Sequence, residues 1–175
     1  EGSVSPAMRA LATLAAALLA LVGPAHAQVR DTLTIGITQF PATLHPMIDS
    51  MAAKTYVLHM ARRPLTTYDK DWKLVCLICV ELPTFENGGA RRVTLPDGKE
   101  GAEVTFRIQA DAKWGDGRPV VAKDAILAWD VGRHPRSGVA SGEGYRRILK
   151  VEAPDEKTVV FTNDRVTFSY NDFSQ

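Results

Sequence analysis

Cysteine is nearly absent from the sequence: the 175 residues contain two, Cys76 and Cys79, and no second Cys-x-x-C pair that would complete a zinc site. Neither sign of charge is in excess, because 21 Lys and Arg against 20 Asp and Glu give a net charge of +1. This balance argues against a nucleic-acid-binding surface. The HExxH, GxSxG, P-loop and dinucleotide-binding motifs are also missing, so we expect neither an enzyme nor a cofactor. A secreted hydrolase stays as the alternative, although no nucleophile with a neighbouring base is visible.

Histidine is also sparse: the sequence has four, three of them after residue 27. His45, His59 and His134 lie far apart in the sequence, and each is interpreted as an ordinary structural or surface residue. No metal site is therefore expected.

The only long hydrophobic run lies near the N-terminus, in residues 10–27 (ALATLAAALLALVGPAHA). It follows Met8 and a basic residue and ends in a small-x-small sequence, a pattern typical of a secretory signal peptide cleaved after Ala27. The run is short for a transmembrane helix, and a buried alanine-rich helix is the alternative interpretation. No cysteine follows the cleavage site, so a lipid anchor is not indicated. We expect residues 1–27 to be removed, with those before Met8 forming an N-terminal extension, and the exported protein to begin at Gln28.

The rest of the chain is predicted to be α+β with more strand than helix. Asn87-Gly88-Gly89 and Asp97-Gly98 are turn signals, and the alternation of apolar and polar residues around them predicts antiparallel strands with one solvated face. Helices are expected at 51–61 and from 122 onwards. Strands are expected at 32–38, 65–68, 74–80, 104–108, 148–153 and 158–162, with further strand-like sequence at 166–170.

The stretch KWGDGRPVVAKDAILAWD, residues 113–130, predicts a strand end, a tight turn and a helix start. Asp-Gly favours the turn because glycine tolerates a positive φ, and the proline fixes φ just before the helical spacing begins. We expect both tryptophans to be largely buried on the apolar faces of this unit. The residues that carry the prediction are Trp114, Asp116, Gly117, Pro119, Asp124 and Trp129.

The pair Cys76 and Cys79 lies in the apolar, strand-like run VCLICV. In a regular strand, residues three apart face opposite sides, so a disulfide between them requires a bend or bulge. A local disulfide, two buried thiols, and a metal or redox site are three interpretations that the sequence leaves open.

The order of these features resembles the N-terminal third of the extracytoplasmic solute-binding proteins of the peptide/nickel ABC transporters (the oligopeptide- and dipeptide-binding family 5). The resemblance rests on TLTIGIT, PLTTYDKDW, VTFRIQADAKWGDGRPVVAKDAI and YRRILKVEAPDEKTVVFT, and it covers residues 32–173. It implies a type II periplasmic-binding-protein-like fold. Residues 28–50 would form the first strand and loop of the main lobe, and residues 51–175 a β-rich subdomain. The chain would then be a fragment of a longer protein, with an incomplete second lobe.

By this resemblance the protein is the periplasmic substrate-binding component of an ABC transporter, with a peptide or small solute as ligand and membrane permease subunits as partners. A ligand-binding sensor or chaperone on the same fold is the alternative. The early loop, residues 39–47, is expected to face the ligand. For each candidate residue in it, an ordinary structural role in the loop is the competing interpretation. These candidates are Gln39, Phe40, Thr43 and His45.

Three departures from the family pattern bear on local structure and ligand preference. Val121 stands where the family often has the Thr or Ser that caps a helix, so Asp124 must assist by its charge near the helix N-terminus. Leu44-His45-Pro46 stands where the early loop of the family often reads Leu-Asp-Pro, and Arg62 and Arg63 stand where the family often has Glu-Gly. The last two departures put local ligand preference in doubt.

Overall fold

The computed structural model describes residues 31–174, so the predicted signal peptide lies outside the described residues. The chain divides into two units between Gly36 and Ile37, and only residues 31–36 of the first unit are described. Residues 31–37 run without regular secondary structure, and the strand predicted at 32–38 is therefore wrong. A strand is held by backbone hydrogen bonds to a neighbour, and none of the described residues pairs with this segment. Its side chains accordingly lie in solvent, with Leu33 83% exposed.

The second unit opens with helix α2, Ala52–Ala61, which confirms the helix predicted at 51–61. The chain leaves the helix in an extended conformation at Arg62, two residues before Pro64, as a proline demands of the residues that precede it. A two-stranded hairpin follows, made of β1, Thr66–Tyr68, and β2, Leu74–Cys76. Its antiparallel pairing confirms the predicted strand–turn–strand unit.

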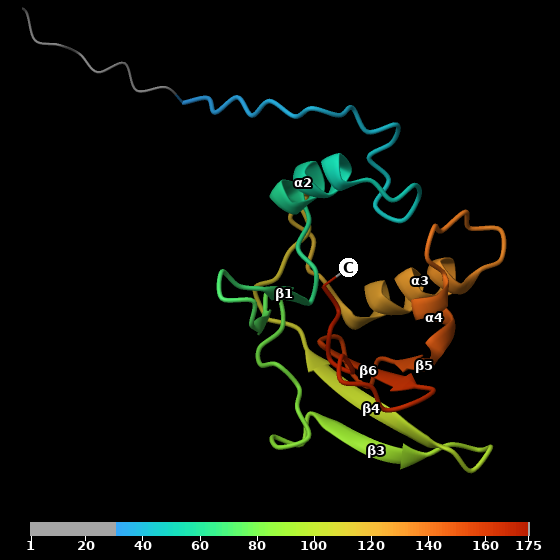
Figure 1. Cartoon of the computed structure of the whole chain (residues 1–175). Helices are drawn as coiled ribbons and strands as arrows, with labels where there is room; N and C mark the ends of the chain where they lie inside the picture. Colours follow the sequence, from blue (N-terminus) through green and yellow to red (C-terminus); the bar gives the residue numbers. More distant parts are fainter. Residues whose placement is uncertain (1–30, 175) are drawn as a thin grey trace, which may run out of the picture. The chain divides into compact units, whose positions relative to one another are not determined.

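A four-stranded antiparallel sheet forms the centre of this unit, in the order β3-β4-β6-β5 (Figure 1). The Asp97-Gly98 turn joins β3 to β4, as predicted, and Gly98 has the positive φ of 81° that such a turn requires. β4 and β6 pair through Val104 opposite Phe161 and Phe106 opposite Val159. The strands are β3, Ala90–Thr94; β4, Glu100–Arg107; β5, Ile148–Glu152; and β6, Thr158–Asn163.

The hydrophobic core lies on one face of β4 and β6. Val104, Phe106 and Val159 are completely buried, because the period-two alternation of β4 sends every second side chain to the same face. Burying a side chain of this size contributes about 1.5–3 kcal/mol. Glu103, which precedes Val104 in β4, lies on the other face and forms an ion pair with Arg91 of β3. The predicted solvated face is thus confirmed.

Helix α3, Ala122–Arg133, packs on β5 and β6, and the short α4, Glu143–Arg147, leads into β5 (Figure 1). After β6 the chain is irregular: the strand-like sequence at 166–170 forms turns rather than a strand. This segment is held instead by contacts with the hairpin and the sheet. Phe173 exchanges hydrogen bonds with Thr66 of β1, and its ring lies 4.3 Å from that of Phe161. The α+β class and the antiparallel architecture are as predicted.

Candidate functional site

Most of the side chains predicted to contact a ligand are exposed in the early loop. Gln39 and Phe40 lie in solvent, Phe40 with 92% of its surface exposed. Thr43 and His45 belong to one turn, in which the Thr43 hydroxyl accepts the His45 backbone N–H at 3.1 Å. The His45 ring nitrogen Nδ1 in turn accepts the N–H of Met47 at 3.3 Å. The structure thus joins Thr43 and His45 and leaves Gln39 and Phe40 apart from them, and a ligand role for all four stays a prediction.

The course of this loop is fixed by a buried cation. Lys54 of α2 is only 4% exposed, and its ammonium group donates hydrogen bonds to the backbone carbonyls of His45, Ile48 and Asp49. A lysine can be buried in this way because its three N–H groups are satisfied by three acceptors. The neighbouring carbonyl of Met47 accepts the Ala140 N–H at 3.0 Å, from the loop after α3. The loop backbone is therefore ordered although its side chains face solvent.

A separate groove, with a volume of about 1120 Å³, lies between the end of α2, the helices α3 and α4, and the segment after β6. Of the early loop only Pro46 contributes to its wall, so none of the four loop candidates lines it. Apolar and aromatic side chains dominate the wall, as is usual for small-molecule sites. Sequence reasoning missed this groove, because its walls come from segments about a hundred residues apart. The arginines and aromatic residues of its wall include Arg62, Arg63, Trp114, Trp129, Tyr145 and Tyr170.

One wall of the groove is the strand–turn–helix unit predicted from the sequence. Gly117 has a φ of 85°, and the Gly117 N–H donates to the Trp114 carbonyl at 2.9 Å, which closes the predicted turn. Asp116 accepts the Arg118 backbone N–H at 3.0 Å, and this bond and the Arg118 side chain lower the pKa of its carboxyl. Pro119 bridges back to Lys113 across the turn.

The helix start uses Asp124 in place of the missing cap. Its carboxylate accepts the Val121 backbone N–H at 3.0 Å and the Trp114 indole N–H at the same distance. Val121 has no side-chain acceptor, so only this half of a capping box is formed. Asp124 therefore stabilises the helix by direct hydrogen bonds as well as by the predicted charge effect.

The two tryptophans differ in burial. Trp129 is partly buried, and its indole N–H donates to the carbonyls of Tyr145 and Ile148 at 3.2 and 2.9 Å. Trp114 is 50% exposed, so the expectation that both tryptophans are largely buried is wrong. Trp114 follows β4 at the turn closed by Gly117, where it lines the groove and stays half exposed.

Tyr145 lies on the wall formed by α4 and packs against α3. Burial raises the pKa of its hydroxyl, and the positive charge of Arg62 partly opposes this effect. Its ring occupies the space above Gly132, where a Cβ atom would come within 2.3 Å of the ring. The glycine is thus required for this packing.

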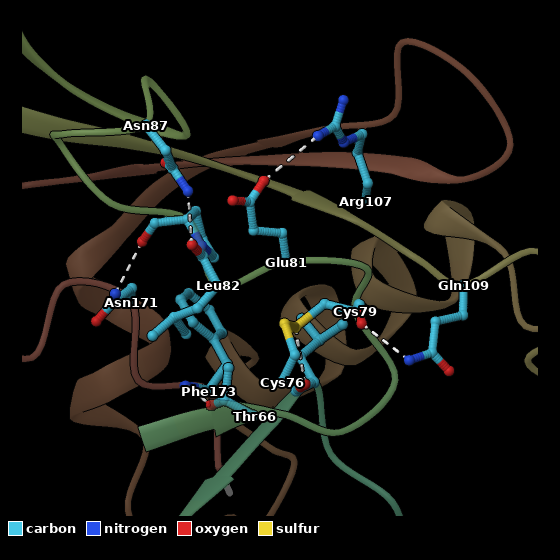
Figure 2. The surroundings of a disulfide bond; sticks show 12 residues. Thr66, Cys76, Cys79, Glu81, Leu82, Asn87, Arg107, Gln109, Asn171 and Phe173 are labelled. Carbon is cyan, nitrogen blue, oxygen red and sulfur yellow. Dashed lines mark hydrogen bonds and ion pairs between the residues drawn. A yellow bond between two sulfur atoms is a disulfide. The ribbon is translucent and has the colours of Figure 1, made fainter. Parts of the chain in front are cut away.

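Cys76 and Cys79 form a disulfide bond next to the groove (Figure 2). Strand β2 ends at Cys76, and the chain then turns so that Cys79 bridges to Ile108 beyond the end of β4. This is the bend that the sequence required for bridging. Gln109 further donates to the Cys79 carbonyl at 3.0 Å, so hydrogen bonds connect this bend to the residues that follow β4 (Figure 2).

Between residues 31 and 174, no three His, Cys, Asp or Glu side chains gather as they would around a metal ion. Over the same residues, no helix has both the length and the apolar character needed to cross a membrane.

Comparison with known proteins gives a consistent family relationship. Residues 96–174 match the bacterial extracellular solute-binding proteins, family 5 Middle. The probable D,D-dipeptide-binding periplasmic protein DdpA of Escherichia coli K12 is 30% identical over 161 residues, which are 86% of this chain and 28% of that protein.

Solved structures agree with this relationship. The oligopeptide-binding protein of Thermus thermophilus, complexed with a pentapeptide, superposes with a TM-score of 0.63 at 24% identity, over 73% of this chain and 22% of that chain. The protein AgaA of A. tumefaciens R10, in complex with agropinic acid, gives a TM-score of 0.59 at 26% identity, over 76% and 24%. The chain therefore spans about a quarter of the length of the relatives it matches.

Proposed function

Since the chain belongs to family 5 of the bacterial extracellular solute-binding proteins, we propose that it is part of the periplasmic substrate-binding component of an ABC importer for peptides or related small solutes. The observation that carries this proposal is the similarity over 86% of the chain to a periplasmic dipeptide-binding relative. The match of residues 96–174 to the family supports it.

In this function the protein binds and releases its ligand without making or breaking a covalent bond, so it is not an enzyme. Proteins of this kind enclose a ligand between two lobes that move about a hinge. Hydrogen bonds to a peptide backbone, which is the same in every peptide, permit many side chains to be accepted. The ordered early loop with its exposed side chains is suited to such contacts, and Gln39, Phe40, Thr43 and His45 stay our candidates for them.

The cellular location follows from the same proposal. Residues 1–27 would direct export and be cleaved after Ala27, and membrane permease subunits would receive the ligand from the exported protein.

Uptake in the source bacterium tests the proposal. Deletion of the gene should lower the accumulation of radiolabelled di- to pentapeptides, and reintroduction of the gene should restore it. If a permease gene lies next to this gene, its deletion should produce the same loss. Unchanged accumulation of every peptide in the deletion strain would overturn the transport role.

A further inference from the structure

The Asn87-Gly88 pair has a chemical reactivity that solute binding does not use. An asparagine side chain can react with the backbone nitrogen of the residue that follows it. Glycine at that position favours the reaction, because it has no Cβ atom and leaves the backbone free to adapt. Of the three asparagines in the chain, Asn163 and Asn171 precede aspartate, and only Asn87 precedes glycine. Asn87 is therefore the most reactive asparagine of the unfolded chain.

The pair lies at the surface of the folded protein. Asn87 and Gly88 are both exposed, so water reaches them, whereas Asn171 is only 7% exposed. Gly88 has a positive φ of 73°, and a Cβ atom at this position would meet nothing within 4 Å. Access of solvent therefore does not limit a reaction at Asn87.

Hydrogen bonds hold the Asn87 side chain at both polar atoms of its amide. The Oδ1 atom accepts the backbone N–H groups of Thr84 and Gly89, each at 2.9 Å, and Nδ2 donates to the Leu82 carbonyl at 3.0 Å (Figure 2). The Asn87 backbone N–H also donates to the Thr84 hydroxyl at 3.1 Å. For reaction, the side chain must bring its Cγ atom over the Gly88 nitrogen, and this rotation breaks the bonds of the amide.

The loop that Asn87 organises, residues 82–89, is in contact with the segment after β6. The Pro83 carbonyl accepts a hydrogen bond from the Asn171 side chain at 2.8 Å, and the Phe85 ring lies 4.5 Å from that of Tyr170. Tyr170 lines the groove. A change in this loop therefore reaches the wall of the groove.

We propose that Asn87 is a site of spontaneous deamidation and that the hydrogen bonds of the loop slow the reaction in the folded protein. The Gly88 nitrogen forms a bond to Cγ of Asn87 as the bond from Cγ to Nδ2 breaks. The proton of the Gly88 N–H passes to solvent, and Nδ2 takes up a proton and leaves as ammonia. Water then opens the cyclic imide at either carbonyl, which gives aspartate or isoaspartate without a change of oxidation state.

Either product weakens the loop. An aspartate can still accept the Thr84 and Gly89 N–H groups, but it has no N–H for the Leu82 carbonyl and places a charged oxygen beside it. Isoaspartate in addition lengthens the main chain by one carbon between residues 87 and 88. The modification should therefore loosen the contacts between this loop and the segment after β6.

The test follows deamidation in the 175-residue chain by mass spectrometry of the tryptic peptide 74–91, which contains Asn87, and of the peptides that contain Asn163 and Asn171. The chain is incubated in mildly alkaline buffer, once folded and once reduced and unfolded in guanidinium chloride. In the unfolded chain, Asn87 should deamidate faster than the other two asparagines. Folding should slow the reaction at Asn87 by about tenfold or more, because several hydrogen bonds must break before attack.

Variants examine the loop itself. Thr84→Ala removes the hydroxyl that accepts the Asn87 N–H and should speed deamidation several-fold in the folded chain, with no effect in the unfolded chain. Thr94→Ala is the matched control, because it replaces an exposed threonine at the end of β3, outside the loop, and should leave both rates unchanged. Asn87→Asp imitates one product and should accelerate hydrogen exchange at the Ala90 amide, which donates to the Thr84 carbonyl at 2.9 Å.

Three outcomes would overturn the inference: no faster deamidation at Asn87 than at Asn163 and Asn171 in the unfolded chain, equal rates at Asn87 in the folded and unfolded chain, or equal rates in the two folded threonine variants. Circular dichroism establishes that each variant is folded. If Thr84→Ala does not fold, the comparison of the folded and unfolded wild-type chain still decides. Peptide uptake tests the proposed function independently of all three.

Discussion

At the scale of the residue, the indole N–H groups of Trp114 and Trp129 lie in different environments. The N–H of Trp129 donates to the carbonyls of Tyr145 in α4 and Ile148 at the start of β5, and the guanidinium group of Arg133 stacks 4.0 Å from the centre of its ring. The N–H of Trp114 bonds to Asp124, which has a second donor and access to solvent. The loss of the donor should therefore matter more at Trp129.

Replacement of each tryptophan by phenylalanine tests this difference. Trp129→Phe keeps an aromatic ring but leaves the Tyr145 and Ile148 carbonyls without their donor, and we expect a loss of about 1–3 kcal/mol in the free energy of unfolding. Trp114→Phe should cost less than about 1 kcal/mol, because water can replace the indole N–H at Asp124. Urea denaturation followed by circular dichroism measures both. Equal losses would show that burial and hydrogen bonding do not distinguish the two sites.

At the scale of the element, the disulfide fixes the bend that follows the two-stranded hairpin. Cys76 ends β2, and Cys79 bridges to Ile108, just beyond the end of β4. A hairpin of two three-residue strands has few backbone hydrogen bonds of its own and is at best marginally stable alone. The bond therefore favours the bent conformation in which the residues after the hairpin hydrogen-bond to the end of β4.

The double variant Cys76→Ala/Cys79→Ala should lower the free energy of unfolding by about 2 kcal/mol, the value that loop-closure entropy gives for so short a loop. Hydrogen exchange should accelerate most at the Val80 and Gln109 amides, which bond across the junction. The reduced wild-type chain is the matched control and should behave like the variant. Unchanged stability and exchange would mean that non-covalent packing alone holds the hairpin.

How far the sequence predicted each element depends on whether its signal is local. The Asp97-Gly98 turn and the alternation through Val104 and Phe106 are decided by neighbouring residues, and the structure confirms both. The segment 32–38 has the same β-branched composition but requires a partner strand, and composition cannot supply one. The groove forms where α2, α3, α4 and the segment after β6 meet in the folded chain, so no local sequence pattern predicts it. The sequence shows Arg62 and Arg63 only as a departure from the family pattern, not as residues of a groove wall.

At the scale of the whole molecule, three turns repeat one arrangement of charge. Asp97, Asp116 and Asp155 each accept the backbone N–H of the residue two positions on, at 2.8–3.1 Å. In every case that residue is basic. For Asp97 the Lys99 side chain, and for Asp116 and Asp155 the backbone N–H, is the chief cause that lowers the carboxyl pKa below its ordinary value of 3.8.

These shifts predict loss of stability in acid. A carboxyl whose pKa is lower in the folded than in the unfolded chain stabilises the fold above the unfolded value, and this contribution disappears as the pH falls below it. The urea midpoint should therefore stay nearly constant from about pH 7 to about pH 5 and fall below about pH 4. The triple variant Asp97→Asn/Asp116→Asn/Asp155→Asn keeps an acceptor in each turn without the titrating charge. Its midpoint should fall less steeply in acid, and an identical fall would contradict the prediction.

Lys54 has a consequence for how this protein can change over evolutionary time. The three bonds of its ammonium group end on carbonyl oxygens of the main chain, which every amino acid supplies. Substitutions at the exposed positions of the early loop therefore leave its anchoring intact. Mutation could exchange the outward side chains one by one, and so change the surface of the loop, while a single interior lysine preserves its path.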